Sequence, residues 1–285
     1  MTEILITGAK GQLGSELRNL LDERDVKYDA FDSNQMDITD SSIVNKKFDL
    51  VQPKVVYHCA AYTAVDDAED VGEKANYSVN VLGTENIARA CAKQNTIMVY
   101  ISTDYVFNGR KKSNEYMPSD PKDPLNNYGK AKARGEELVK ELCPKYYIVR
   151  TSWAFGYWGK NFVYTMLRLA KSHTELTVVN DQFGRPTWVR TLAEFMTFLV
   201  NENKNWGIYQ CCDDGVCTWY DFACEVLKDS KVKVCPVTSD HYPTKAIRPQ
   251  YSVMYLSKET GFKFPNWKIS LAKFMQYLRN KGELK

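Results

Sequence analysis

Short β-rich runs and longer runs with helical spacing alternate along the first half of this chain. Residues 4–7 form a β-rich run, and leucines at positions 13, 17, 20 and 21 then recur with the spacing of one helix face. The same pattern predicts strands at residues 27–31, 54–59, 98–101 and 146–150. Helices are expected near residues 40–51, at residues 73–93 and around residues 128–132. Regular alternation of this kind predicts an α/β fold with a doubly wound parallel sheet.

A glycine-rich segment, Gly8-Ala9-Lys10-Gly11-Gln12-Leu13-Gly14, separates the first strand from the first helix. Glycines let the backbone turn tightly and approach a pyrophosphate, and the helix N-terminus offers unpaired N–H groups. We therefore predict a Rossmann-type NAD(P) site, although a glycine turn alone can be purely structural. Asp32 lies where an acid binds the ribose hydroxyls of NADH, while Lys10 suits the 2′-phosphate of NADPH. The sequence leaves this choice open.

The pattern loosens beyond residue 150. Aromatic residues cluster at positions 153–158, and helices are expected near residues 187–201, 218–229 and 268–280 with short strands between them. We expect residues 1–150 to form the NAD(P)-binding domain. Residues 151–285 are expected to form a smaller α/β substrate-binding cap, with some segments returning to the main sheet.

Tyr128 and Lys132 are four residues apart, a spacing that places two side chains on one helix face. An ammonium close to the phenol would lower the phenol's pKa from its usual value near ~10 and make it a proton handle at neutral pH. An exposed tyrosine and lysine on an ordinary helix is the plainer alternative. Thr103 and Asp104 follow the strand at 98–101, where parallel sheets bind their ligands.

Composition excludes several classes of protein. With 44% hydrophobic and 26% charged residues the chain is globular, and a net charge of +3 gives no reason to expect nucleic acid or a membrane surface as a partner. No apolar run approaches the ~20 residues of a membrane span, so we expect a cytoplasmic protein. The eight cysteines are expected to be reduced core thiols, and with three histidines no metal site is predicted.

Five stretches together resemble the dTDP-4-dehydrorhamnose reductase family of extended short-chain dehydrogenases/reductases. They are Thr7 to Gly14, Ser102-Thr103-Asp104-Tyr105-Val106-Phe107, Tyr128 with Lys132, Arg150-Thr151-Ser152-Trp153, and Asp181-Gln182-Phe183-Gly184-Arg185-Pro186-Thr187. The resemblance covers nearly the whole chain. The glycine turn and the Tyr-x-x-x-Lys pair belong to the whole superfamily, whereas the second and fifth stretches are much narrower signals.

The resemblance implies a cofactor site and a catalytic set. The implied cofactor is NADPH, with NADH as the alternative, and it would contact Gly8, Gly11, Gln12, Leu13, Gly14, Asp32, Asp37, Ile38, Ala60, Ala61, Tyr62, Tyr128 and Lys132. Tyr128 would donate a proton to the C4 oxygen of the substrate. Lys132 would bind the nicotinamide ribose and tune the phenol, and Thr103 would polarise the same C4 oxygen.

Substrate contacts are implied for Thr103, Asp104 and Trp153. Core packing for Trp153 and a strand-end cap for Asp104 are the plainer alternatives. Arg185 and Arg248 are candidates for the substrate diphosphate because arginine pairs readily with phosphate oxygens. Lys245 is a further candidate, and an exposed ion pair is an equally good reading of it.

Some members of this family join two subunits through magnesium held by carboxylates. Glu16 matches one such position, but Arg190 stands where another acid would align. We therefore predict no structural metal and a monomer or weak homodimer.

The implied reaction is reduction of dTDP-4-dehydro-L-rhamnose to dTDP-L-rhamnose, a precursor of cell-surface polysaccharide. Two alternatives share the fold. A nucleotide-sugar epimerase or dehydratase would return the hydride, and a regulatory subunit would bind NADP without catalysis.

Overall fold

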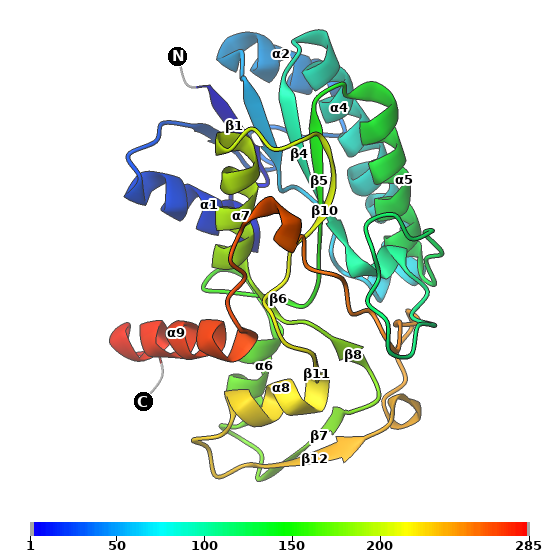
Figure 1. Ribbon diagram of the computed structural model, residues 1–285, viewed down its shortest axis with the longest axis vertical. Coiled ribbons are helices and arrows are strands. Elements are labelled where there is room, and N and C mark those ends of the chain that lie inside the picture. The colour runs from blue at the N-terminus through cyan, green and yellow to red at the C-terminus, as the bar shows by residue number, and fades with distance from the viewer. Residues whose placement is uncertain (1–2, 284–285) are drawn as a thin grey trace.

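A single parallel sheet organises the chain, as a computed structural model describing residues 3–283 shows (Figure 1). The strand order is β10-β5-β4-β3-β1-β2, and every neighbouring pair is parallel. The strands are β1 (Ile4–Thr7), β2 (Asp29–Phe31), β3 (Val55–His58), β4 (Ile97–Thr103), β5 (Tyr146–Thr151) and β10 (Gly207–Gln210). The predicted doubly wound α/β sheet is confirmed.

Helices cover both faces of this sheet (Figure 1). On one face lie α1 (Gln12–Glu23) and α7 (Val189–Asn201); on the other lie α2 (Ser41–Val51), α4 (Thr84–Lys93) and α5 (Asn127–Leu142). Each face has its own core. Leucines of α1 and α7 pack on one side, and apolar residues of α2 and α4 on the other.

The helix expected at residues 73–93 is not a uniform α-helix. It consists of α3 (Glu73–Tyr77), a π-helical turn at Ser78–Gly83 and α4. A Cβ on Gly83 would lie 2.6 Å from the Ile38 side chain, so the absence of a side chain lets this turn approach the loop after β2. The wider turn also carries Asn80, whose side chain hydrogen-bonds the backbone of Tyr62.

The C-terminal residues build a second, smaller layer in the lower half of Figure 1. It contains α6 (Phe162–Leu169), α8 (Trp219–Val226) and α9 (Trp267–Asn280), and its strands pair as β7 (Glu175–Val179) with β12 (Lys233–Val237), β8 (Phe183–Gly184) with β11 (Cys217–Thr218), and β6 (Ala154–Phe155) with β9 (Thr187–Trp188). Its core is strongly aromatic, with Phe155, Phe222 and Phe274 completely buried. Two later segments nevertheless belong to the main sheet layer, because β10 pairs with β5 and α7 packs on α1.

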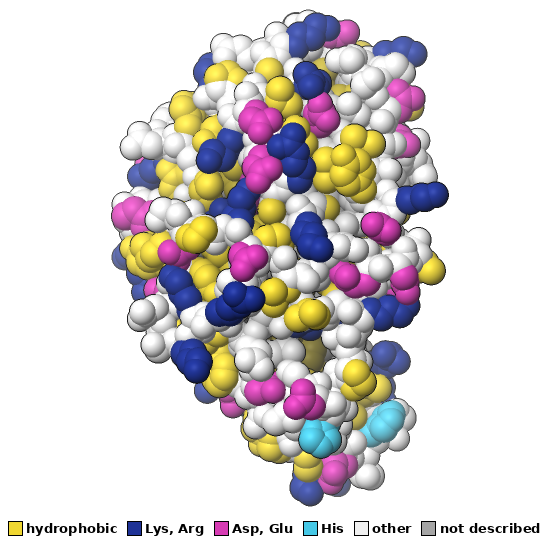
Figure 2. All heavy atoms as spheres, turned by 90° about the vertical axis from the view of Figure 1, so that its right-hand side faces the viewer, with side chains coloured by type: hydrophobic (Ala, Val, Ile, Leu, Met, Phe, Trp, Pro, Cys, Tyr) yellow, Lys and Arg dark blue, Asp and Glu magenta, His cyan; other side chains and the backbone are white. Residues whose placement is uncertain are grey.

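Short 3₁₀ turns lie at Asp67–Glu69, Asp104–Val106, Ser239–His241 and Lys258–Thr260. Basic and acidic side chains are intermixed over the face shown in Figure 2. Within residues 3–283, no helix is both long and apolar enough to cross a membrane.

Candidate functional site

The glycine turn after β1 is a backbone cradle. Gly8 has φ +66°, and a Cβ there would lie 2.6 Å from the Ala60 nitrogen. A Cβ on Gly14 would lie 2.3 Å from the Gly8 carbonyl oxygen. Gly11 is the N-cap of α1, so no side chain covers the helix N-terminus at this position. The geometry fits a dinucleotide pyrophosphate, which needs close access to N–H groups at a helix start.

Gln12 and Leu13 open α1. The Gln12 Oε1 accepts a hydrogen bond of 3.1 Å from the Asn161 amide of the C-terminal part. Leu13 packs against the core between α1 and the sheet. The cradle is therefore connected to both layers of the molecule.

Asp32 and Lys10 form an ion pair at the end where the sequence places the adenosine ribose. Asp32 is buried, and its carboxylate also accepts hydrogen bonds from the backbone of Asn34 and Gln35. The Lys10 ammonium, with these backbone donors, holds the pKa of Asp32 below its usual range. Both residues that the sequence weighed for cofactor choice thus lie in contact, and Lys10 remains exposed to solvent.

The next two predicted adenosine contacts differ in exposure. Asp37 is exposed, and its carboxylate accepts hydrogen bonds from the Thr39 backbone and hydroxyl. Ile38 is buried against Gly83, and its carbonyl accepts a hydrogen bond from Asn86.

Ala60, Ala61 and Tyr62 follow β3 next to the glycine turn. The Ala60 N–H donates to the Thr7 hydroxyl at 3.1 Å, and the same hydroxyl lies 2.7 Å from Nδ1 of the buried His58. Burial lowers the pKa of His58 to about 3, so this ring is neutral and serves as a hydrogen-bonding scaffold. Ala61 is exposed, and Asn80 fixes the Tyr62 backbone.

Helix α5 begins directly against the end of β4. Its N-cap Asn126 accepts a hydrogen bond of 2.8 Å from the Gly129 N–H. A Cβ on Gly129 would lie 2.2 Å from the Tyr105 carbonyl oxygen, so glycine is required for this approach. The Tyr105 and Tyr128 rings consequently meet edge to face, with centroids 6.0 Å apart.

Lys132 is buried one turn after Tyr128. Its Nζ lies 4.1 Å from the centroid of the Tyr100 ring, a cation–π geometry. Burial lowers the pKa of the Lys132 amine to about 7, and the nearby Glu136 carboxylate opposes that shift.

The expected lowering of the Tyr128 pKa does not occur. Burial raises the pKa of Tyr128, the Asp104 charge raises it further, and a hydrogen bond with Thr103 counteracts only part of the rise. The reason is that desolvation disfavours the phenolate more than its neighbours favour it. Tyr128 therefore keeps its proton at neutral pH.

Thr103 and Asp104 lie at the carboxyl end of β4, where Thr103 pairs in register with Thr151 of β5. The Thr103 hydroxyl donates to Asp104 Oδ1 at 3.1 Å and accepts from the Tyr105 N–H. Burial raises the pKa of Asp104 to about 6. Its Oδ2 is buried without a hydrogen-bond partner among the described residues. The nearby hydroxyls of Ser252 and Thr103 offset part of the rise in the Asp104 pKa.

Trp153 follows β5 and has φ +47°, a left-handed conformation that is strained for a tryptophan. Its ring stacks on Trp219 of α8 with centroids 3.7 Å apart. A Cβ on Gly184 would lie 2.6 Å from the Trp153 indole. The side chain is therefore held between two elements of the C-terminal part while staying partly exposed.

A cavity of about 960 Å³ lies between the loop after β4 and the C-terminal part. Its lining includes the basic run Arg110, Lys111 and Lys112 together with Arg248. Thr103, Tyr128 and Lys132 are not among the lining residues, but the Asn126 side chain at the start of α5 donates to the carbonyl of Ile247 in the lining. The cavity thus adjoins the catalytic candidates. The sequence analysis did not single out this basic run, although three consecutive basic residues beside Gly109 are its signal.

Arg185, a candidate for the substrate diphosphate, is already bound by carboxylates from other segments. It is buried, pairs with Glu115 and Asp214, and is not among the residues that line the cavity. Because both carboxylates already balance its charge, the structure presents Arg185 as a link between three segments rather than as a phosphate ligand.

Arg248 does line the cavity, and there it pairs with Asp66. Lys245 pairs with the exposed Asp70, which is the plainer of the two readings given above.

Arg190 lies among three carboxylates, those of Glu16, Glu23 and Glu194. Glu16 of α1 is completely buried, and the guanidinium supplies the positive charge beside it. Among residues 3–283, no cluster of His, Cys, Asp or Glu is arranged to hold a metal. That a structural metal is unnecessary stays a prediction.

The doubly wound sheet, the glycine cradle and the Tyr-x-x-x-Lys pair at the start of α5 define a Rossmann-type nucleotide-binding protein of the short-chain dehydrogenase/reductase kind. A family model described as RmlD substrate binding domain matches residues 1–280. The chain belongs to this family, as the sequence resemblance implied.

Known relatives agree over almost the full length. The dTDP-4-dehydrorhamnose reductase of Aggregatibacter actinomycetemcomitans is 40% identical, with 97% of this chain and 99% of that protein covered. The spore coat polysaccharide biosynthesis protein SpsK of Bacillus subtilis (strain 168) is 39% identical, covering 97% and 98%. The crystal structure of dTDP-4-dehydrorhamnose reductase from Bacillus anthracis in complex with NADP superposes with a TM-score of 0.93 at 38% identity, covering 97% of this chain and all of that one.

Proposed function

We propose that this chain is an NADPH-dependent dTDP-4-dehydrorhamnose reductase, which reduces the C4 keto group of dTDP-4-dehydro-L-rhamnose to give dTDP-L-rhamnose for cell-surface polysaccharide. The observation that carries the proposal is the set of buried Thr103, buried Lys132 and half-buried Tyr128, together with the glycine turn after β1. The full-length match to reductases of this name supports the same reaction.

Bound NADPH would supply the hydride to C4. Tyr128 donates its proton to the C4 oxygen as negative charge develops there. A phenol whose pKa is raised holds that proton until a stronger base forms, and the developing alkoxide is such a base. Thr103 bonds the same oxygen and stabilises its growing charge.

The Lys132 amine can gain or lose its proton near neutral pH, one helical turn from the Tyr128 phenol. With a pKa of about 7, the amine is partly charged at neutral pH. Positive charge at Lys132 stabilises the phenolate that remains after proton donation. The family resemblance also implies that Lys132 binds the nicotinamide ribose.

The substrate diphosphate is assigned to the basic lining of the cavity. Arg110, Lys111, Lys112 and Arg248 line it together with Asp181 and Asp240, and Lys111 and Arg248 would exchange their present partners, Asp120 and Asp66, for phosphate oxygens. Arginine pairs with phosphate oxygens through two parallel hydrogen bonds. We assign NADPH rather than NADH because the exposed Lys10 can reach a 2′-phosphate while still in contact with Asp32. The relative from Bacillus anthracis was crystallised with NADP.

The test is oxidation of NADPH, and in parallel NADH, with enzymatically prepared dTDP-4-dehydro-L-rhamnose, followed by loss of nicotinamide absorbance. Tyr128→Phe should lower the rate by about 10² to 10⁴ while the protein still binds NADPH, because the proton donor is lost and the glycine turn is intact. Lys10→Met should weaken NADPH more than NADH.

The two alternatives predict different outcomes of the same assay. An epimerase or dehydratase would convert a nucleotide sugar with no net consumption of NADPH. A regulatory subunit would bind NADPH without turnover, and Tyr128→Phe would then change nothing. Cytoplasmic location and a monomeric or weakly dimeric state remain predictions for fractionation and sedimentation.

A further inference from the structure

Arg150 of β5 and Glu136 of α5 form an ion pair that the proposed chemistry does not use. Arg150 Nε and Nη2 each donate 2.8 Å hydrogen bonds to the two carboxylate oxygens of Glu136. Arg150 is 2% exposed and Glu136 is completely buried. Burying two charged side chains costs desolvation free energy. This pair joins β5 to α5, the helix that carries Tyr128 and Lys132.

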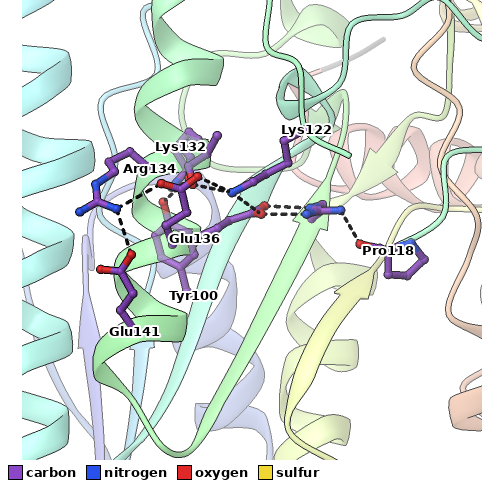
Figure 3. A network of polar contacts seen from close by, with 10 residues as sticks. Tyr100, Pro118, Lys122, Lys132, Arg134, Glu136 and Glu141 are labelled. Atoms are coloured by element: carbon purple, nitrogen blue, oxygen red, sulfur yellow. Dashed lines mark hydrogen bonds and ion pairs between the residues drawn. The ribbon is translucent and has the colours of Figure 1, made fainter. Parts of the chain in front are cut away.

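The pair also holds the loop that lines the cavity, residues 108–124. Arg150 Nη1 donates to the Pro118 carbonyl at 3.1 Å. Lys122 donates to the Ala133 carbonyl of α5 at 2.9 Å and lies 3.8 Å from Glu136. Figure 3 shows Pro118 and Lys122 reaching this network from the loop, on the side of Glu136 away from Arg134. The Arg150 guanidinium also lies 5.0 Å from the centroid of the Phe107 ring, just before the loop. Arg150 therefore contacts both the residue that precedes the loop and the middle of the loop.

Glu136 lies one helical turn beyond Lys132. The groups that interact with the Lys132 amine are Glu136 on α5, His58 and Cys59 at the end of β3, and Tyr100 on β4, while Tyr128 lies one turn earlier on the same helix. Burial keeps the tyrosines, the cysteine and the histidine uncharged at neutral pH. Among these neighbours, Glu136 is therefore the one that supplies negative charge.

We propose that Glu136 and Arg150 are positioning residues for the reduction, which fix the helix carrying Tyr128 and Lys132 to the loop 108–124 that receives the nucleotide sugar. The inference rests on the proposed function. Arg150 holds the loop through Pro118, and Glu136 favours the charged form of Lys132. Neither residue touches the reacting atoms.

Two variants separate these roles. Arg150→Met/Glu136→Leu removes both charges together, so no buried charge is left unpaired and folding is preserved. Arg150→Lys keeps both charges, but one ammonium cannot reproduce the planar, multiple donation to Glu136 and Pro118. Leu199→Ala is the matched control, because it opens the core under α7, away from the loop.

For the double variant we expect a KM for the nucleotide sugar raised about tenfold or more, since small displacements of binding groups cost this much. The alkaline limb of the kcat profile should move to lower pH because Lys132 loses its anionic neighbour. Trypsin should cut the double variant after Arg110, Lys111 or Lys112 faster than it cuts Leu199→Ala. Each digestion is run at the same number of degrees below the melting temperature of the variant concerned. Arg150→Lys should raise KM while leaving the alkaline limb in place.

A double variant with native KM and loop cleavage, or one that matches Leu199→Ala in both, would overturn the inference. Should the double variant fail to fold, the KM and trypsin results for Arg150→Lys decide. If the native protein does not oxidise NADPH, the proposed function fails instead, and loop cleavage still tests whether Arg150 holds the loop.

Discussion

Replacing Arg190 by methionine should destabilise the protein chiefly through one residue, Glu16. The guanidinium lies 3.3 Å from Glu16 and also pairs with Glu23 and Glu194. Glu16 is completely buried, whereas the side chains of Glu23 and Glu194 are 50% and 40% exposed. Loss of the pair with Glu16 should therefore lower the free energy of unfolding much more than loss of the pairs with Glu23 or Glu194.

Leaving a buried charge without its partner costs about 3–5 kcal/mol, while each exposed pair contributes about 0–1 kcal/mol. We expect Arg190→Met to lower the free energy of unfolding by roughly 3–7 kcal/mol. At about 2–4 °C per kcal/mol, the melting temperature should fall by roughly 6–28 °C. The double variant Glu16→Gln/Arg190→Met should recover most of this loss.

The loss should also depend on pH. Burial raises the pKa of Glu16 above 4.5 even with Arg190 present, and removing the guanidinium raises it further. The folded state then binds a proton that the unfolded state releases, so stability falls as pH increases through this range. Arg190→Met should accordingly be closest to the native protein near pH 5 and furthest from it near pH 8.

Thermal unfolding followed by circular dichroism across this pH range provides the assay, with Glu23→Gln as the control for an exposed pair. Equal losses in Arg190→Met and in the double variant, or a loss that does not vary with pH, would refute the reasoning. In the native protein, neither EDTA nor excess magnesium should shift the melting temperature. Stoichiometric magnesium in a purified dimer would contradict the prediction that no structural metal is needed.

Three further predictions concern the site. Gly14→Ala should abolish NADPH binding in a titration, because its Cβ would lie 2.3 Å from the Gly8 carbonyl oxygen and the backbone cradle must open; native affinity would count against the cradle. Gly184→Ala should cost about 1–3 kcal/mol through overpacking against Trp153, which Trp219 prevents from retreating, and the near-ultraviolet circular dichroism of the stacked indoles should change. Lys132→Met should abolish turnover yet stabilise the cofactor-free protein near pH 6. The stability advantage of Lys132→Met should shrink between pH 7 and pH 10. The reason is that the Lys132 amine, with a pKa of about 7 in the folded protein, loses its proton at lower pH there than in the unfolded chain. A difference in melting temperature that stays constant with pH would contradict this prediction.

Local patterns were sufficient to predict most of the elements and the placement of Tyr128 and Lys132 on one helix. Strand and helix spacing predicted the sheet, and the four-residue interval placed Tyr128 and Lys132 together because a helix needs only local information. The direction of the Tyr128 pKa was predicted wrongly, since burial depends on residues distant in sequence, such as Asp104 and Thr103. The spacing of residues in the sequence predicts which side chains are neighbours on one helix or strand. It does not predict how far other elements shield those side chains from solvent.

The same limit explains the other differences. Arg185 carries the charge expected of a phosphate ligand, but the partners that neutralise it, Glu115 and Asp214, come from other segments. The pairing of Arg150 with Glu136 crosses from a strand to a helix and has no periodic signal. The π-helical turn at Ser78–Gly83 was predicted as ordinary helix, because its contacts with Ile38 and Tyr62 come from distant segments and leave no periodic signal.

The pairing of β10 with β5 has a consequence for the order in which the protein is made. Until residues 207–210 have left the ribosome, β5 is an outer edge with unpaired backbone groups, the kind of surface that associates with other chains. The nucleotide-binding half is synthesised first but completes its sheet late. A nascent chain paused shortly after residue 151 would therefore hold a finished glycine cradle and an unfinished sheet, and it would depend on rapid elongation or on a chaperone to keep that edge apart from others.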